Sequence, residues 1–128
     1  MNKKRSIKIT AGRISIRAEL TNTKTADAIW NALPIEADCS RWGEEIYFEI
    51  PVTSELDDSA RDIVNIGDLG FWPPGNAFCI FFGPTPISNG DTIRPASAVN
   101  IVGRINGDPK VFAEVSSGVQ VRIEREDH

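Results

Sequence analysis

The amino-acid sequence predicts a mainly β protein: a closed, mostly antiparallel β-barrel of about eight strands with two short helices. In most of the chain apolar and polar residues alternate with a period of two, turn residues separate these runs, and only two short stretches have helical spacing. A barrel closes such a set of strands without leaving long exposed edges. With 128 residues and neither a linker nor an internal repeat, the chain is expected to form a single domain, residues 1–128.

Residues 67–83 are the expected centre of the sheet. This segment contains five of the nine Phe and Trp residues of the chain. Its run 78–82 is apolar on both alternating faces, so it needs cover on both sides. The Pro73-Pro74 pair cannot donate ladder hydrogen bonds and ends the preceding strand, and Gly75-Asn76 favours a turn. The segment therefore predicts a strand, a tight connection and a buried central strand.

The first half of the chain predicts a hairpin, a helix and two further strands. Residues 7–20 alternate around a central glycine, which is typical of a hairpin. Residues 25–33 have apolar side chains at helical spacing, threonines before them that can cap a helix, and a proline after them. A helix this short needs docking, so we expect it to cover one open end of the barrel. The runs 35–42 and 44–50 predict two strands.

The second half predicts one polar excursion, shorter strands and the second helix. Residues 54–66 are acidic and polar, with at most one weak helical turn. A short strand is expected at 92–95 and a longer one at 98–105. An Asp-Pro pair opens the segment 108–115, where the aspartate can cap a short helix and proline fits its first turn. The alternating run 119–123 predicts the last strand.

Charge and hydropathy argue against membrane and nucleic-acid partners. No apolar run approaches the roughly 18 residues that span a bilayer, and no apolar segment follows the basic residues 1–5 as in a signal peptide, so we expect a cytoplasmic protein. The net charge is −4, and the 14 Lys and Arg residues are spread along the chain. The basic start is therefore expected to be a solvated tail.

Cysteine and histidine usage argues against metal and triad chemistry. Cys39 and Cys79 lie in predicted strands with apolar neighbours, so we expect two buried, reduced thiols that do not bond to each other. The only histidine is His128, the last residue, which argues against a catalytic triad or a histidine metal cluster. No metal and no cofactor is expected.

Three stretches of the sequence resemble the cyclophilin fold. Residues 12–33 resemble that family's second strand and its P-K-T-x-x-N-F-x-x-L helix. Residues 75–80 resemble the segment that leads into its Q-F-F-I strand, and residues 102–111 resemble its F-G-K-V-x-x-G turn and helix. The resemblance covers nearly the whole chain and implies a cyclophilin-like barrel. It is closer still to the small prokaryotic cyclophilin-like proteins of unknown function, in residues 42–48, 67–73 and 81–86.

The sequence departs from the cyclophilins where prolyl isomerase activity resides in that family. The isomerases carry an arginine within F-H-R-x-I-x-x-F-x-x-Q-G-G-D, and residues 39–52 have no counterpart to that string. The isomerases also carry a later W-L-x-G-x-H loop. In this chain residues 89–91 stand in its place and contain neither the Trp nor the His. The resemblance implies that isomerisation needs an arginine that polarises the prolyl amide beside an apolar pocket. Arg41 is the nearest candidate by order along the chain.

Polar candidates for a ligand site occur on three predicted strands. Arg41 can clamp a carbonyl or carboxylate beside an aromatic wall, or it is an exposed arginine stacked on a neighbour. Glu45, Tyr47 and Glu49 share one strand face, which is a polar pocket wall or an acid/base pair in one interpretation and the outer face of a barrel strand in the other. Asn100 lies on a buried strand, where it needs hydrogen-bond partners and is either structural or pocket-lining.

Aromatic candidates come from the central segment. Trp72 stands beside two prolines and either floors a ligand groove or belongs to the core. Phe78 and Phe82 are core residues in one interpretation and supply groove surface in the other.

Three functions remain open on the sequence alone. The first is a domain that binds a small molecule or peptide in an aromatic groove, without appreciable prolyl isomerase activity. The second is a prolyl isomerase that uses Arg41, and the third is a structural, oligomer-forming barrel. The missing arginine string favours the first, and either a monomer or a homodimer is compatible with it.

Overall fold

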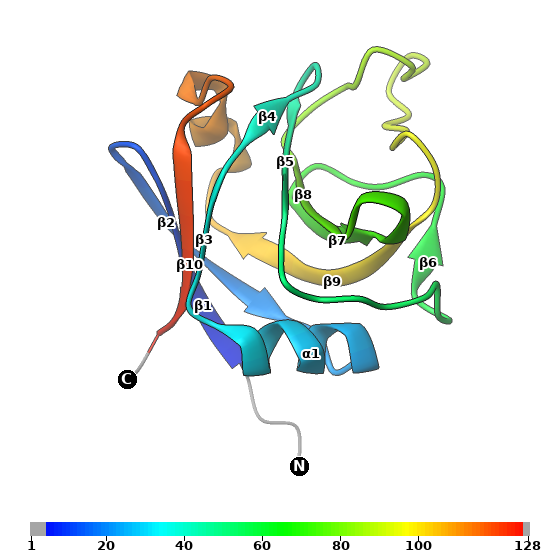
Figure 1. The fold of residues 1–128 in the computed structure, drawn as a ribbon. Helices are drawn as coiled ribbons and strands as arrows, with labels where there is room; N and C mark the ends of the chain where they lie inside the picture. The colour runs from blue at the N-terminus through cyan, green and yellow to red at the C-terminus, as the bar shows by residue number, and fades with distance from the viewer. Residues whose placement is uncertain (1–4, 127–128) are drawn as a thin grey trace.

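The computed structural model describes residues 5–126 of the chain, shown in Figure 1. Met1–Lys4 of the basic start and the single histidine, His128, lie outside the described residues. The described chain folds into one antiparallel sheet of ten strands, one α-helix and two short 3-10 helices. The strands are β1 (Arg5–Ala11), β2 (Ile14–Leu20), β3 (Ile35–Asp38), β4 (Ser40–Arg41), β5 (Glu45–Glu49), β6 (Ala60–Arg61), β7 (Asp68–Trp72), β8 (Ala77–Phe81), β9 (Val99–Asn106) and β10 (Gln120–Arg125).

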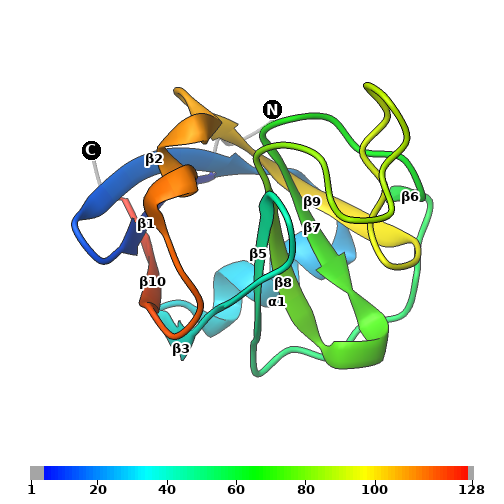
Figure 2. The same ribbon diagram turned by 90° about the horizontal axis from the view of Figure 1, so that it is seen from above.

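The mainly β, antiparallel character is confirmed, but the prediction of a closed barrel with about eight strands is wrong. The strand order is β3-β10-β1-β2-β9-β7-β8-β5-β4, and no ladder joins its two ends within residues 5–126. The end strands β3 and β4 are two halves of the stretch that alternation predicted as one strand. They are separated at Cys39, whose N–H donates to the Val119 carbonyl over 3.0 Å and whose carbonyl accepts from the Gly118 N–H over 2.8 Å. One half pairs with β10 and the other with β5, so the sheet curls round without closing (Figure 2).

Of two smaller expectations for the loops, one is incomplete and one is wrong. The segment expected to be a polar excursion contains β6, whose two residues pair with Asn100 and Val99 of β9. The strand expected at 92–95 is absent, because Thr92 and Ile93 make only isolated bridges, to Asn89 and Val64. The β6–β9 pairing and the Val64–Ile93 bridge both join residues distant in sequence, so local alternation does not predict them.

Both expected helices are present. Helix α1 (Lys24–Ala32) begins after Thr23, whose hydroxyl accepts from the Ala26 N–H over 3.1 Å. It runs beneath the strands and covers one end of the curled sheet (Figure 1). The 3-10 helix η2 (Pro109–Glu114) begins after Asp108, which accepts from the Lys110 N–H. No helix within residues 5–126 has the length and apolar character needed to cross a bilayer.

Strand β8 lies inside the sheet, between β5 and β7, and both of its faces are covered. On one face Phe78 and Ile80 join the inner cluster, the main apolar core, which also contains Ile46, Phe48 and Phe82. Its other face contributes to a second set of apolar residues, the outer cluster. The outer cluster consists of Val64, Ala77, Cys79, Phe81, Ile93 and Val99, with Tyr47, Trp72 and Ile101 packed against them. The prediction of a central strand with two buried faces is therefore confirmed.

Candidate functional site

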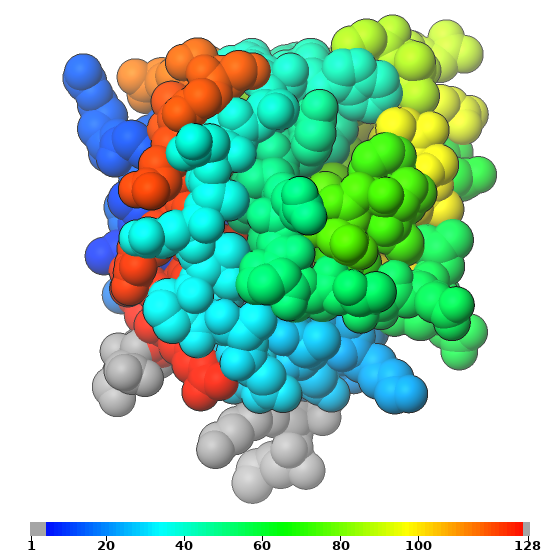
Figure 3. Space-filling view, in the orientation of Figure 1, coloured from blue at the N-terminus to red at the C-terminus, as the bar shows by residue number. Residues whose placement is uncertain are grey.

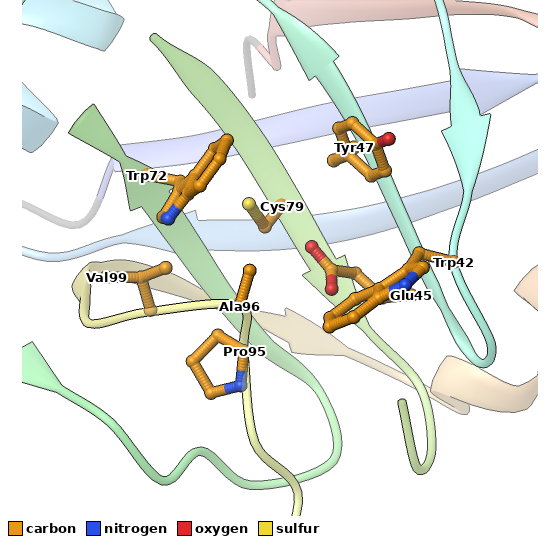
Figure 4. A pocket seen from close by; sticks show the side chains of 8 residues that line it. All are labelled: Trp42, Glu45, Tyr47, Trp72, Cys79, Pro95, Ala96 and Val99. Atoms are coloured by element: carbon orange, nitrogen blue, oxygen red, sulfur yellow. The ribbon is translucent and has the colours of Figure 1, made fainter. Parts of the chain in front are cut away.

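A pocket of about 140 Å³ opens in the outer cluster, and we call it the outer-face pocket. Strands β5, β7 and β8 supply its floor and sides, and the segment before β9 closes another side (Figure 4). On the surface, the β5 strand, the green turn after β7 and the yellow segment before β9 meet on the same face of the molecule (Figure 3). The lining residues are Trp42, Glu45, Tyr47, Trp72, Cys79, Pro95, Ala96 and Val99.

The pocket exists because small residues occupy the middle of this sheet face and large ones its border. Cys79 of β8 lies opposite Tyr47 of β5 on one side and opposite Gly70 of β7 on the other. A side chain at Gly70 would meet Val99 at 2.9 Å, so glycine lets β7 approach β9 closely. The small Cys79 side chain therefore forms the floor of the pocket, and the larger aromatic side chains around it form the walls (Figure 4).

A two-residue turn places Trp42 and Glu45 side by side. The Trp42 N–H donates to the Glu45 carbonyl over 2.9 Å, and the Glu45 N–H donates to the Trp42 carbonyl over 3.2 Å. Residues paired in this way project from the same face of a hairpin. The turn includes Gly43, with a φ of +63°, where an added Cβ would lie 2.8 Å from Pro86. Only glycine suits that position without rearrangement.

Trp72 is held at the opposite border of the pocket. Its indole Nε1 donates to the Ser97 hydroxyl over 2.6 Å, which ties the ring to the segment that covers the pocket. The ring also lies close over the turn after β7, because a Cβ at Gly75 would come within 2.9 Å of it. The side chain is half-buried, so one part of the ring remains available to the pocket.

Glu45 is the only charged residue among those that line the pocket, and it is buried from solvent. Glu45 is 4% exposed, and its carboxyl oxygen Oε1 has no hydrogen-bond partner among the described residues. Burial raises the pKa of this carboxyl to about 7, because the charged form loses its hydration. The neighbouring Cys79 thiol partly offsets that rise. Glu45 is therefore poised to change charge near neutral pH.

Cys79 lies beside the Glu45 carboxyl group (Figure 4). Its pKa is raised well above the usual value, first by burial and then by the nearby carboxylate charge. A thiol with so little thiolate character is a poor nucleophile. Cys79 therefore serves as a small apolar floor residue, and both Cys39 and Cys79 are free and buried, as the sequence predicted.

Of the six site residues predicted from the sequence, the structure brings two together in the pocket. Tyr47 and Trp72 both line it, from β5 and from the end of β7. Phe78 and Phe82 lie on the other side of the sheet: Phe78 stacks on Phe48 with ring centroids 5.5 Å apart, and Phe82 lies 6.2 Å from the ring of Phe112. Both phenylalanines are fully buried in the inner cluster.

Arg41 lies away from the pocket although Trp42, the next residue, lines it. Neighbouring residues of an extended chain point to opposite faces, and Arg41 points toward η2. Its Nη1 donates to the carbonyls of Ala113 and Val115, and its Nε donates to the Gly43 carbonyl. The guanidinium also lies over the Phe82 ring, 5.1 Å from its centre. These contacts fasten η2 to the sheet.

Asn100 is fully buried on β9 and holds a loop against helix α1. Its amide nitrogen donates to the Thr25 hydroxyl and the Glu55 carbonyl, and its amide oxygen accepts from the Asp57 N–H. The distances are 3.0, 2.9 and 2.9 Å. This network lies outside the pocket lining.

The sequence leaves Glu45 open between a pocket wall and an outer barrel face, and it indicates neither Cys79 nor the 95–96 segment as part of the site. The strand alternation did place Glu45 on the same face as Tyr47, so a polar pocket wall was one of two interpretations. What separates the two is the loop that covers this face, and loop position depends on contacts distant in sequence.

The lining offers a limited chemistry. It presents one carboxyl group, one phenol and one thiol among aromatic and aliphatic surfaces, with no arginine, lysine or histidine among the described residues that line it. No group of three or more potential metal ligands occurs within residues 5–126. The pocket is therefore suited to holding a small apolar group and to accepting a hydrogen bond or a positive charge at Glu45.

Comparison with known proteins agrees with this fold. A cyclophilin-like family model matches residues 5–124. The solution structure of the hypothetical protein AF2241 from Archaeoglobus fulgidus is similar to this chain, with a TM-score of 0.81 at 41% sequence identity, over 96% of this chain and 95% of that one. No curated protein matches the sequence. Because the family match spans nearly the whole chain, the chain belongs to the cyclophilin-like family.

Proposed function

We propose that this chain is a ligand-binding cyclophilin-like domain that holds a small ligand in the outer-face pocket and has no appreciable prolyl isomerase activity. The observation that carries the proposal is the Glu45 carboxyl oxygen, which is buried in the pocket wall without a hydrogen-bond partner. Leaving such a group unsatisfied costs about 1–3 kcal/mol, more when it is charged. A ligand that donates to Glu45 removes this cost on binding.

The size of the pocket limits what can enter it. An apolar protein cavity of about 150 Å³ is large enough to bind benzene, and the outer-face pocket measures about 140 Å³. Its occupant is therefore a small molecule or one side chain of a peptide. Three aromatic residues, Trp42, Tyr47 and Trp72, give that occupant apolar contact from three sides.

The same lining argues against isomerisation. Lowering the rotation barrier of a prolyl amide, about 20 kcal/mol, needs a cation or donor aimed at the amide where charge develops. The described lining contains no basic side chain, and the nearest candidate by sequence, Arg41, donates to three backbone carbonyls. A carboxyl group at Glu45 offers the opposite charge.

Ligand binding can be tested with the three tryptophans of the chain as reporters. Trp42 and Trp72 line the pocket, whereas Trp30 lies on α1 under Arg125 and serves as an internal control. We expect at least one of benzyl alcohol, benzylamine and benzoate to shift the indole N–H signals of Trp42 and Trp72 in NMR spectra and to leave Trp30 unchanged. If none of the three moves the pocket signals more than the control, the binding proposal fails.

The absence of isomerase activity needs a separate assay. We expect wild-type protein to leave the isomerisation rate of a chymotrypsin-coupled prolyl peptide unchanged. Acceleration that disappears in Arg41→Ala would establish an arginine-dependent isomerase, and acceleration that survives this change would establish an isomerase that uses another residue. Either result contradicts the second half of the proposal.

A further inference from the structure

The outer-face pocket combines two features that point to one class of ligand. It has aromatic rings on three sides, contributed by the turn before β5, by β5 and by the end of β7. It also has a single charged group among its lining residues, the Glu45 carboxyl, which lies beside Trp42 and across the pocket from Trp72 (Figure 4). Aromatic faces attract cations through their quadrupole, most strongly when water is excluded. A carboxylate in the same pocket also attracts a cation, so the two features favour the same ligand.

We propose that the outer-face pocket selects a small organic cation, a tertiary ammonium group, with the Glu45 carboxylate as its counter-ion and Trp42, Tyr47 and Trp72 as its walls. This inference rests on the proposed ligand-binding function and names its ligand class. Net charge agrees with it, since the chain carries −4 overall and attracts cations rather than anions.

Hydrogen-bond capacity distinguishes a tertiary ammonium from a primary one. A primary ammonium carries three N–H donors that all need acceptors once buried. Within the described lining one buried oxygen, Glu45 Oε1, lacks a partner, and most of the remaining surface is aromatic or aliphatic. A tertiary ammonium has one N–H for that oxygen and three alkyl groups for the rings. A tertiary ammonium therefore leaves no buried N–H without an acceptor in this pocket.

The ionisation of Glu45 sets the pH range in which such a cation binds. Burial raises the pKa of Glu45 to about 7, so the carboxylate becomes the main form only above that pH. The titratable groups that face it are the Tyr47 hydroxyl on its own strand and the Cys79 thiol on β8; β7, β9 and the 95–96 segment add no charged group to the lining. Affinity for a cation consequently rises as pH increases through about 7.

The test compares two probes of equal shape by calorimetric titration of the full-length protein at pH near 8. Dimethylaminoethanol carries the positive charge, and isoamyl alcohol is its uncharged isostere, with a C–H in place of the N–H. We expect the cation to bind about tenfold or more tightly than the alcohol, because tenfold corresponds to about 1.4 kcal/mol, between the exposed and the desolvated values of cation–aromatic attraction. Lowering the pH to 5 should remove most of that preference.

Two pairs of variants assign the effect to the pocket. Glu45→Gln keeps the side-chain volume and removes the charge, whereas Glu49→Gln makes the same change at an exposed position of the same strand. Trp72→Leu removes a pocket ring, and Trp30→Leu removes the ring of α1, outside the pocket. The preference for the cation should disappear in Glu45→Gln, weaken in Trp72→Leu and persist in both controls.

The outcomes separate the two proposals. If the alcohol binds wild-type protein as tightly as the cation, the cation class is wrong and the ligand-binding function stands. If the preference for the cation survives Glu45→Gln, the site is elsewhere and the inference fails. If neither probe binds and the aromatic probes above also leave the pocket signals unchanged, the ligand-binding function fails as well.

Discussion

The two faces of strand β8 differ although their residues alternate along one chain. On the inner face Phe78 and Ile80 are fully buried among aromatic and aliphatic neighbours. On the outer face Cys79 leaves room, and the space above it is bordered by aromatic rings and by a carboxyl group. The inner face is filled and apolar, whereas the outer face has a hollow beside Cys79 that is bordered by the unsatisfied acid Glu45 of β5.

This difference separates the face that stabilises the fold from the face where we propose that a ligand binds. Filling a face with large apolar side chains stabilises the fold and leaves no space for a ligand. A hollow with an unpaired buried carboxyl group lowers stability, and such features concentrate at functional sites. Substitutions on the two faces should therefore differ in their effect on stability, and the predictions below run from the largest effect to the smallest.

Substitution of neighbouring residues on β8 gives the largest contrast. Phe78→Ala should lower the free energy of unfolding by about 3–5 kcal/mol, because it opens a cavity in the inner cluster. Cys79→Ala removes only the sulfur atom, beside an existing hollow, and should cost about 1 kcal/mol. Urea unfolding of both variants measures the difference. Equal losses for the two would contradict the division between a filled and a hollow face.

The second experiment concerns Glu45 and pH. The pKa of this carboxyl is raised from 4.5 in the unfolded chain to about 7 in the folded protein, so the folded state binds more protons between these values. Stability from this group is therefore fully present below pH 4.5 and is lost as pH rises through about 7. Glu45→Gln should remove that loss, which amounts to about 3 kcal/mol between pH 4.5 and 8.

Urea unfolding across this pH range, with Glu49→Gln as the control, measures the effect of Glu45. The wild type and the control should become less stable from pH 4.5 to 8, while Glu45→Gln stays nearly level over that interval. Parallel curves for all three proteins would show that Glu45 is not desolvated.

Asn100 is a buried polar group whose hydrogen bonds are made, so the effect of replacing it on stability should not depend on pH, unlike that of replacing Glu45. Asn100 makes three hydrogen bonds that join β9 to α1 and to the loop around Asp57. Asn100→Ala should cost about 1–3 kcal/mol at every pH, because the partners lose their bonds inside the fold. Thermal unfolding at two pH values would reveal it, and a variant as stable as wild type would mean that the network is not formed.

The smallest effect concerns the two thiols. Burial raises the pKa of Cys39 and, more strongly, of Cys79. Both should therefore react slowly with iodoacetamide in the folded protein and rapidly in denaturant, as followed by intact mass. Rapid modification of native Cys79 would indicate that the pocket floor is open to water and reagents.

The sequence predicted what local patterns control. The capping threonine before α1, the Asp108-Pro109 start of η2 and the two apolar faces of the run 78–82 each signal their structure within a few residues. The split of 35–42 at Cys39 was not predictable in this way, because it follows from backbone bonds to Gly118 and Val119, far along the chain.

The site was predictable only in part, for the same physical reason. Tyr47 and Trp72 were recognised as candidates because aromatic residues next to polar or proline residues are typical of ligand surfaces. Glu45 belongs to a pocket wall only because the 95–96 segment covers its strand face, and that cover is not signalled by the residues around Glu45. The prediction of Arg41 as a site residue rested on its position next to Trp42. Alternation along an extended chain, however, directs the two side chains to opposite faces.

The most direct measurement is the titration of the Glu45 carboxyl group itself. NMR of its side-chain carboxyl carbon, assigned by comparison with Glu45→Gln, reports the pKa in the folded protein. We expect a value of about 7, with a decrease when dimethylaminoethanol occupies the pocket. A value near 4.5 that does not respond to the cation would mean that Glu45 is hydrated, and the outer face would then have no desolvated site for a ligand.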